Sequence, residues 1–216
     1  MPGPEVVTIV NGQFVQNCYL VADPATREAV IVDPGEETDR FLAELERRSW
    51  TLKAIWLTHA HVDHIMGVGA IRRAHEGVPI FLHPADRPLY DALPEQGQWM
   101  GLRLDPPPAP DHELVHGETL QVGSHAFEVR ATPGHSPGSV SLRREGLIIG
   151  GDVLFSGSIG RTDLPGGDTA TLIRSIHREF LSLPDPTVVL SGHGPATTVG
   201  AERETNPFLT GQYGLA

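Results

Sequence analysis

The sequence predicts an α/β protein built as a four-layer αββα sandwich, with two stacked β-sheets and helices on both outer faces. Each half of the 216-residue chain holds strand-like apolar runs together with amphipathic helical segments, without a true sequence repeat. Hydrophobic residues make up 39% and charged residues 20% of the chain, as in ordinary globular proteins with an ample core. Because elements with one apolar face pack in such layers, we expect this fold, in a single domain over residues 1–216.

Strand and turn signals organise the first half of the chain. Asn11-Gly12 separates two apolar runs and is a strong hairpin signal. A third run ends at Asp33-Pro34-Gly35, where proline and glycine turn the chain. Thr38 is expected to cap a helix that extends to about Ser49. The strands predicted in this half cover residues 6–10, 14–22, 28–32, 53–57 and 78–82.

Other segments of the first half have weaker patterns. Gly67 and Gly69 fall inside the helix predicted after residue 64, where each costs ~1 kcal/mol against alanine. We attribute them to a backbone that packs close to the histidine-rich segment before it. A polar helix is expected to begin at residues 83–86. From residue 93 to 110 periodicity fails, which predicts a long ordered loop of the kind that often covers an active site. An inter-domain linker is the alternative, and Trp99 and Met100 would form an apolar wall for a substrate.

The second half repeats this pattern. Residues 171–183 are amphipathic, with Leu172, Ile176 and Phe180 among the apolar residues of one side, which predicts a helix. Glycine-containing turns at residues 123–124 and 145–146 separate short apolar runs. The strands predicted here cover residues 119–122, 126–131, 139–143, 147–149 and 187–190, of which the last is expected to be the final strand of the chain.

Charge and cysteine content limit the partners and the compartment. Sixteen Lys and Arg against 27 Asp and Glu give a net charge of −11, which argues against nucleic acid and anionic membranes as partners. Cys18 is the lone cysteine and lies in an apolar run, where a buried structural thiol is expected. The N-terminus lacks the features of a signal peptide, and no run approaches the ~18 apolar residues of a membrane helix. We therefore expect a cytoplasmic protein, and a homodimer is compatible with the sequence.

The most informative stretch is residues 58–64. Three histidines and an aspartate follow the apolar run 54–57, and loops at strand ends often carry chemistry. Because His and Asp resist burial unless they are paired or bind a metal, this density favours a metal site. A polar turn with exposed histidines is the alternative. The candidate ligands are His59, His61, Asp63 and His64.

Three further candidate ligands share one context. His135, Asp152 and His193 each follow an apolar strand and lie beside glycine, which permits a tight backbone. With the first cluster they make five histidines and two aspartates, enough for two cations. Imidazole and carboxylate suit Zn²⁺, and also Fe and Mn. The remaining histidines are expected on the surface, and these are His75, His83, His112, His116, His125 and His177.

The order and spacing of these seven residues resemble the metal-binding motif of the metallo-β-lactamase superfamily, and the match runs over nearly the whole chain. The matching positions are His59-x-His61-x-Asp63-His64, His135, Asp152 and His193. The resemblance implies an αββα sandwich of two mixed sheets with a dinuclear centre at one edge. It implies one metal at His59, His61 and His135, a second at Asp63, His64 and His193, and Asp152 as the bridge.

The chemistry of such a centre is that of a hydrolase. Two cations ~3.5–4 Å apart lower the pKa of a shared water, so a bridging hydroxide can attack a carbonyl without a serine or cysteine nucleophile. We expect Asp63 also to be catalytic, accepting or relaying a proton as the intermediate collapses. Asp33 and Thr58 are candidates for holding imidazole N–H groups in place, or are ordinary turn and strand-end residues.

Residues 160–168 resemble the glyoxalase II-like branch of the superfamily, especially its short bacterial members, as do residues 192–195 and 204–208. Full glyoxalase II hydrolyses the thioester S-lactoylglutathione and has a C-terminal helical domain that this chain is too short to contain. Arg161 matches the basic position that contacts glutathione there, or pairs with Asp163 or Asp168. Asp163 and Pro195-Ala196 stand where that branch has aromatic residues. The resemblance implies a hydrolase of S-lactoylglutathione or a related acyl thioester, with Arg161 and Trp99 as substrate contacts.

Three alternative functions stay open. Residues 160–163 also resemble the corresponding segment of persulfide dioxygenases, which oxidise glutathione persulfide. In that family one iron is held by the counterparts of His59, His135 and Asp152, or of His61 in some descriptions. Residues 164–168 fit the hydrolase branch better. Lactonase or β-lactamase activity would use the same hydroxide chemistry. A non-catalytic binding module is least expected, because none of the seven ligands is substituted.

Overall fold

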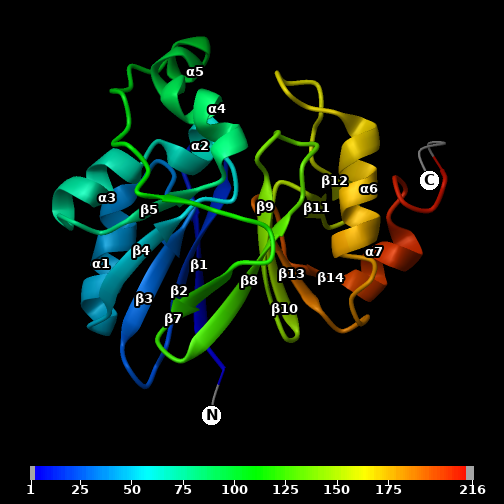
Figure 1. Ribbon diagram of the computed structural model, residues 1–216, viewed down its shortest axis with the longest axis horizontal. Coiled ribbons are helices and arrows are strands. Elements are labelled where there is room, and N and C mark those ends of the chain that lie inside the picture. Colours follow the sequence, from blue (N-terminus) through cyan, green and yellow to red (C-terminus); the bar gives the residue numbers. More distant parts are fainter. Residues whose placement is uncertain (1–2, 213–216) are drawn as a thin grey trace.

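The computed structural model of the protein describes residues 3–212. Two six-stranded sheets stack face to face, with α1 (Thr38–Arg48) and α3 (Val68–Ala74) outside one of them (Figure 1). The helices α6 (Thr169–Glu179) and α7 (Val199–Thr205) lie outside the other. The predicted αββα architecture is therefore confirmed. The single domain predicted over residues 1–216 stays a prediction, and residues 1–2 and 213–216 lie outside the described part.

Both sheets are mixed, as predicted. The first contains, in order across it, β1 (Glu5–Asn11), β2 (Gln16–Ala22), β3 (Glu28–Val32), β4 (Thr51–Trp56), β5 (Ile80–Leu82) and β6 (His112–Glu113). Its first three strands are antiparallel neighbours, and β3 to β6 are parallel. The second contains β14 (Thr197–Thr198), β13 (Val188–Ser191), β10 (Leu147–Gly151), β9 (Val140–Arg144), β8 (His125–Ala131) and β7 (Thr119–Val122). In it, β10 and β13 run parallel and the other pairs run antiparallel.

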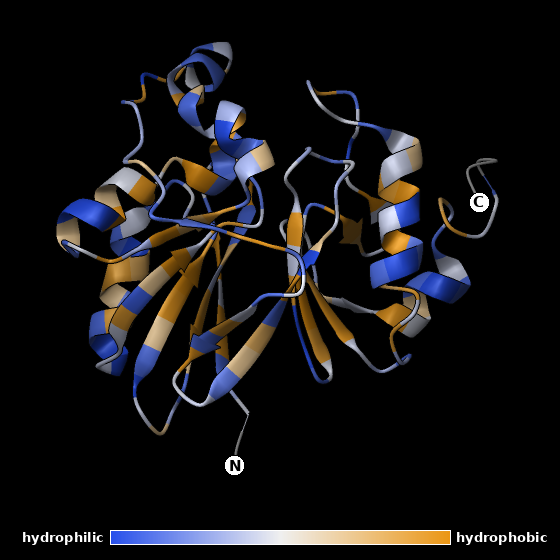
Figure 2. Ribbon diagram, in the orientation of Figure 1, coloured by the Kyte–Doolittle hydropathy of each residue, from blue (hydrophilic) through white to orange (hydrophobic). Residues whose placement is uncertain are grey.

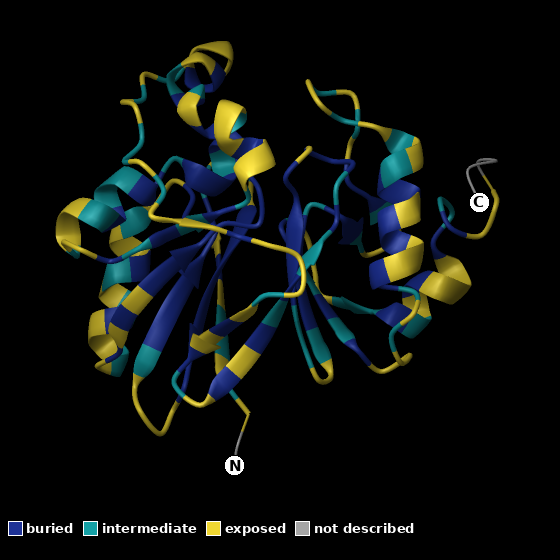
Figure 3. Ribbon diagram, viewed as in Figure 1, coloured by how far each residue is buried: buried dark blue, intermediate teal, exposed yellow. Residues whose placement is uncertain are grey.

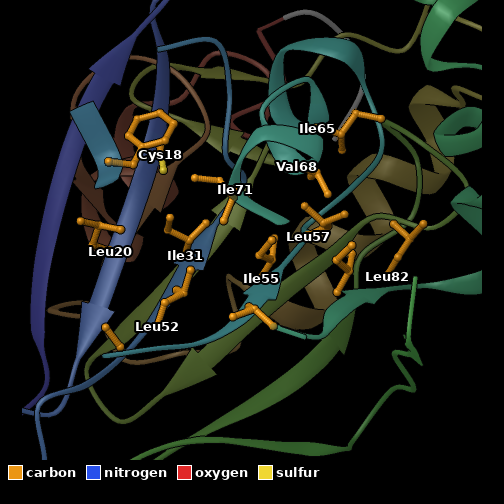
Figure 4. Packing of buried hydrophobic residues seen from close by; sticks show 14 of the residues in the cluster. Cys18, Leu20, Ile31, Leu52, Ile55, Leu57, Ile65, Val68, Ile71 and Leu82 are labelled. Atoms are coloured by element: carbon orange, nitrogen blue, oxygen red, sulfur yellow. The ribbon is translucent and has the colours of Figure 1, made fainter. Parts of the chain in front are cut away.

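Side-chain alternation along the strands divides the core between the layers. In β2, Leu20 packs beneath the outer helices, whereas Tyr19 points between the sheets. Figure 4 shows the outer cluster, where Leu20 lies in the same group as Ile71 of α3. Between the sheets, Trp56 and Phe127 meet edge to face with ring centroids 5.8 Å apart. The strands are accordingly hydrophobic and largely buried, while the outer helices also expose polar faces (Figures 2 and 3).

The late helix and the cysteine follow their predictions closely. The apolar side of α6 packs on the second sheet through Leu172, Ile176 and Phe180. The helix begins at Thr169, because the Asp168 carboxylate caps it by accepting a hydrogen bond from the Thr171 N–H at 2.7 Å. Cys18 is fully buried, and burial raises the pKa of its thiol, which confirms a structural thiol. None of the helices in residues 3–212 has the length and apolar character needed to cross a membrane.

Two expected features of the first half are wrong in detail. The connection between β1 and β2 takes residues 12–15, so β2 begins at Gln16 and not at residue 14. Gly12 and Val15 adopt positive φ angles of 65° and 55° there, a wider turn than a two-residue hairpin loop. Thr38 is the first residue of α1, and Glu37 holds the cap position without a side-chain hydrogen bond.

The helix predicted after the histidine cluster is divided in two. It forms α2 (Val62–Ile65) and α3, with Gly67 between them. A Cβ on Gly67 would lie 2.3 Å from the Gly35 carbonyl oxygen, so only glycine allows this close backbone contact. Close backbone packing therefore explains Gly67, but its partner is the loop at Gly35 and not the histidine-rich segment named in the prediction. A Cβ on Gly69 would have its nearest neighbour at 3.4 Å, so that reason does not apply there.

Residues 93–110 do not form one long loop, which corrects the sequence-based expectation. A 3₁₀ turn (Pro84–Asp86) and α4 (Arg87–Asp91) lead into α5 (Leu93–Trp99). The sequence did not predict this helix because Pro94 and Gly97 are poor helix formers, although proline is tolerated in a first turn. Leu104 packs over Gly97, where a Cβ would lie 2.9 Å from the Leu104 side chain. Residues 100–111 are irregular and return to the first sheet at β6.

Several short elements escaped prediction. The segments β6, β11 (Leu154–Phe155), β12 (Ser158–Ile159) and β14 have two residues each, too few for a periodic pattern. The strand at 187–190 is therefore not the last one, since β14 and α7 follow it. Among the histidines expected on the surface, His125 is buried, with its Nε2 3.9 Å from Asp23. That nitrogen has no hydrogen-bond partner within residues 3–212.

Candidate metal centre

All seven predicted ligands come together at one edge of the two sheets. His59 and His61 lie in the loop after β4, and Asp63 and His64 lie on α2. His135 lies in the β8–β9 connection, while Asp152 and His193 directly follow β10 and β13. In Figure 1, α2 and the β11–β12 hairpin lie at this upper edge. Strands that end at a common edge bring together ligands that are distant in sequence.

Three imidazoles converge in the first ligand set. The His61 Nδ1 lies 2.8 Å from the His135 Nε2, which lies 3.2 Å from the His59 Nε2. All three side chains are buried. Where the facing nitrogens are both unprotonated, their lone pairs repel one another at this distance, and a cation between them removes that repulsion. Tetrahedral Zn–N bonds of ~2.0–2.1 Å place ligand nitrogens ~3.3 Å apart, so this set fits a divalent cation.

The second set is formed by Asp63, His64 and His193. The Asp63 Oδ2 lies 3.1 Å from the His193 Nε2 and 3.7 Å from the His64 Nε2. One ligand atom from each residue lies within 4.8 Å of the others, as in the first set. Two imidazoles and one carboxylate are again a donor set suited to Zn²⁺, Fe or Mn.

Asp152 faces both sets. Its Oδ1 lies 3.4 Å from the His64 Nε2, and its Oδ2 lies 3.5 Å from the Nε2 atoms of both His135 and His193. Within residues 3–212, the buried His64 Nε2 and Asp152 Oδ1 find no hydrogen-bond partner. Buried polar atoms of a native protein are normally satisfied, so these orphaned atoms fit a pair of cations bridged by the carboxylate.

The pKa shifts of His59, His61 and Asp152 suit metal binding, which needs neutral imidazole and ionised carboxylate. Burial lowers the pKa of His61 to about 3, and burial together with the neighbouring His64 lowers the pKa of His59 well below its usual range. Burial opposes ionisation of Asp152, but the adjacent His64 and His135 imidazoles outweigh it and lower the pKa of this carboxyl group. At His64 and His193 burial also opposes protonation, but the neighbouring Asp63 and Asp152 carboxylates raise the pKa of both imidazoles, so a cation would displace protons there.

Asp33 and Thr58 hold imidazoles in place. The sequence left open whether they do this or are ordinary turn and strand-end residues. The Asp33 Oδ2 lies 3.0 Å from the His64 Nδ1, and the same carboxylate accepts hydrogen bonds from the Thr58 N–H at 2.7 Å and hydroxyl at 2.5 Å. The Thr58 Oγ1 lies 3.1 Å from the His59 Nδ1. An Nδ1–H held this way leaves the Nε2 lone pair facing the centre.

Backbone carbonyls orient two other ligands in the same manner. The His135 Nδ1 lies 2.7 Å from the Arg161 carbonyl oxygen, and the His193 Nδ1 lies 3.1 Å from that of Phe14. Each ring therefore has its outer nitrogen engaged and its Nε2 turned toward the centre. These contacts explain why residues 160–168 and the β1–β2 turn belong to the site.

Asp86 and Gln96 are parts of the site that sequence reasoning missed. The buried Asp86 carboxylate accepts hydrogen bonds from the Ala60 N–H at 3.0 Å, the Ser136 hydroxyl at 2.7 Å and the Gly138 N–H at 2.6 Å. It thereby joins the loop of His59 and His61 to the loop of His135. Gln96 of α5 accepts from the Val62 N–H and donates to the Ala60 carbonyl, both at 3.0 Å. Nothing local in the sequence marks either side chain.

Replacing Asp86 by alanine is expected to destabilise the protein by about 2–4 kcal/mol, because three buried donors lose their acceptor. Loosening both ligand loops is also expected to weaken metal binding by about 10–100-fold. Denaturant unfolding and metal titration with a competing chelator measure the two effects. Asp91→Ala is the matched control, since this exposed carboxylate on α4 forms its ion pair with Arg87 and its loss is expected to cost ~0.5 kcal/mol. Equal behaviour of the two variants would contradict the role assigned to Asp86.

A cavity of 680 Å³ opens onto the centre. Both residues predicted to contact substrate lie on its wall, with Trp99 70% exposed and Arg161 paired to Asp163 through two hydrogen bonds of 2.7 and 2.8 Å. The predicted apolar wall also includes Met100. The other lining residues are Phe14, His61, Val62, Asp63, Leu89, Ala92, Glu95, Gln96, His135, Asp152, Phe155, Ser158, Ile159, Leu164, Pro165 and His193.

An αββα sandwich with two His/Asp ligand sets at its sheet edge, opening onto one cavity, defines the class of metallo-hydrolases. The chain belongs to the metallo-β-lactamase superfamily, whose family model matches residues 11–193. It is 40% identical to the hydroxyacylglutathione hydrolase GloC of Haemophilus influenzae over 200 residues, covering 91% of this chain and 93% of that protein.

Two solved structures have the same fold at similar identity. One is that of the BLEG-1 B3 metallo-β-lactamase, with a TM-score of 0.89, 43% identity and coverage of 96% of this chain and 100% of that chain. The other is that of TTHA1623 in a di-iron-bound form, with a TM-score of 0.87, 41% identity and coverage of 94% and 100%.

Proposed function

We propose that this metallo-hydrolase is a glyoxalase II-like thioester hydrolase that acts on S-lactoylglutathione or a related acyl thioester. The observation that carries the proposal is the pair of three-residue ligand sets faced by one carboxylate, Asp152. The 40% identity to a hydroxyacylglutathione hydrolase favours a thioester over other carbonyl substrates. We expect Zn²⁺ in both sites. Fe is the alternative, because a related solved structure is described in a di-iron-bound form.

The residues of the centre have separate roles in the proposed reaction. His59, His61 and His135 would hold one cation, Asp63, His64 and His193 the other, and Asp152 would bridge them. Bound there, the cations would supply an activated water at neutral pH and polarise the thioester carbonyl. Asp63 lines the cavity and is placed to accept a proton and relay it to the departing sulfur. Asp33 and Thr58 keep the imidazoles oriented, and Trp99 and Arg161 contact the substrate at the cavity wall. The products are the carboxylic acid and the thiol.

One specific observation favours a second candidate, β-lactam hydrolysis. The BLEG-1 B3 metallo-β-lactamase matches this fold at 43% identity, and an amide carbonyl in a strained ring can be attacked at the same centre. The persulfide dioxygenase predicted as runner-up differs in needing a single iron and molecular oxygen. A cytoplasmic location and a homodimer stay predictions.

Metal analysis of protein purified without added metal, together with activity assays, tests the proposal. We expect about two Zn, Fe or Mn per chain, with hydrolysis of S-lactoylglutathione or simpler acyl thioesters exceeding that of a β-lactam. A single iron per chain, with oxygen consumed on addition of glutathione persulfide, would overturn the proposal in favour of the dioxygenase. Faster turnover of β-lactams than of every thioester would favour the second candidate.

A further inference from the structure

We infer that the cavity selects thioesters with an apolar acyl group and does not depend on a charged thiol such as glutathione. The inference rests on the proposed thioester hydrolysis and specifies the substrate class. Three features of the cavity carry it, namely the chemistry of its walls, the charge along them and the way α5 is anchored.

Apolar side chains from both halves of the fold form the cavity walls. Trp99 and Met100 at the end of α5 come from the first half, and Phe155 and Leu164 come from the second. Figure 1 shows α5 and the connection between β12 and α6 rising on either side of the upper edge. Trp99 is 70% and Met100 47% exposed. Single exposed apolar side chains are ordinary, but a group of them around a catalytic centre indicates an apolar ligand.

The positive charge along the walls is too sparse to match the two carboxylates of glutathione. Among the cavity-lining residues within the described part of the chain, Arg161 is the only lysine or arginine, and its guanidinium is held by the Asp163 carboxylate. Glu95 adds a negative charge to the α5 side of the wall. A carboxylate on the thiol would therefore compete with Asp163 for Arg161, and a neutral thiol would not need it.

The α5 wall is fixed relative to the metal centre before substrate arrives. Gln96 is buried, and its amide group contacts the Ala60 carbonyl, the Val62 N–H and the Leu89 carbonyl at 3.0, 3.0 and 2.7 Å. Ala60 lies between the ligands His59 and His61, and Trp99 follows Gln96 by nearly one helical turn. A wall anchored in this way contacts an acyl chain without a large ordering cost.

A series of thioesters with one neutral thiol, N-acetylcysteamine, tests the acyl preference in the metal-loaded protein. We expect kcat/KM, measured by thiol release, to rise about two- to fourfold per methylene from acetyl through butyryl to hexanoyl. In Trp99→Ala the rise per methylene is expected to be smaller. Val115→Ala is the matched control, since Val115 is 60% exposed but is not among the cavity-lining residues, and the full rise is expected there. A rate that does not rise with chain length, or a rise unchanged in Trp99→Ala, would overturn the inference.

The thiol preference is tested by comparing hexanoyl thioesters of glutathione and of N-acetylcysteamine. We expect kcat/KM values within tenfold of each other, and a preference for glutathione above tenfold would contradict the inference.

A binding measurement separates failure of the inference from failure of the proposed function. Non-hydrolysable S-methyl, S-butyl and S-hexyl thioethers of N-acetylcysteamine are titrated into the protein and into Trp99→Ala by isothermal titration calorimetry, a readout that does not require the exposed Trp99 as a reporter. If no thioester is hydrolysed, the proposed function fails. In that case an affinity that rises with chain length and depends on Trp99 still upholds the apolar cavity, and a flat series overturns it.

Discussion

Replacing Asp63 by alanine is expected to lower kcat/KM for thioester hydrolysis by at least about a hundredfold while the fold stays intact. Even changes beyond the direct metal ligands cost about 10–100-fold, and Asp63 is both a candidate ligand and the proposed proton relay. Its side chain lines the cavity, so its removal opens no void in the hydrophobic core. Steady-state kinetics, metal content and circular dichroism measure the three parts of this expectation.

Glu145→Gln is the control for Asp63→Ala. It also removes one negative charge, but at an exposed turn between β9 and β10, and unchanged kinetics are expected. Undiminished turnover in Asp63→Ala would show that the second ligand set is idle and that catalysis needs only the first.

Removal of metal is expected to lower the melting temperature by about 8–16 °C. Two cations, each present at about 30 times its dissociation constant, together stabilise the folded state by about 4 kcal/mol, and each kcal/mol changes the melting temperature of a chain of this size by about 2–4 °C. Without cations, the nitrogens of His59, His61 and His135 converge only on one another, and the Oδ1 of Asp152 has no hydrogen-bond partner within residues 3–212. Differential scanning calorimetry before and after dialysis against a chelator measures the shift.

Restoring Zn²⁺ to the dialysed protein is the control, and the original melting temperature is expected to return. Asp63→Ala, which keeps one complete ligand set, is expected to show a smaller shift. A protein that is metal-free by elemental analysis and melts unchanged would contradict the assignment of these residues as ligands.

The architecture was predictable because its signals are local and repeated. The continuous apolar run 29–32 indicates a strand buried on both faces, and the helical spacing in 171–183 indicates a helix buried on one face. Together they imply a sheet covered by layers on both sides. Helix α5 was not predictable, because it contains Pro94 and Gly97. It is held instead by the buried Gln96 side chain and by Leu104, which packs over Gly97. Tertiary contacts of this kind override local helix propensity.

The sequence by itself determined the seven candidate ligands, because four lie in one dense cluster after a strand and the other three each lie beside glycine after a strand, and both patterns are local. Only the tertiary structure decided which groups hold and surround them. It placed Asp33 on His64, joined two ligand loops through Asp86 and anchored α5 to the loop of His61 through Gln96. The partners in these contacts lie 26 to 52 residues apart. A hydrogen bond over that separation depends on how the layers stack, and no local pattern of residues encodes it.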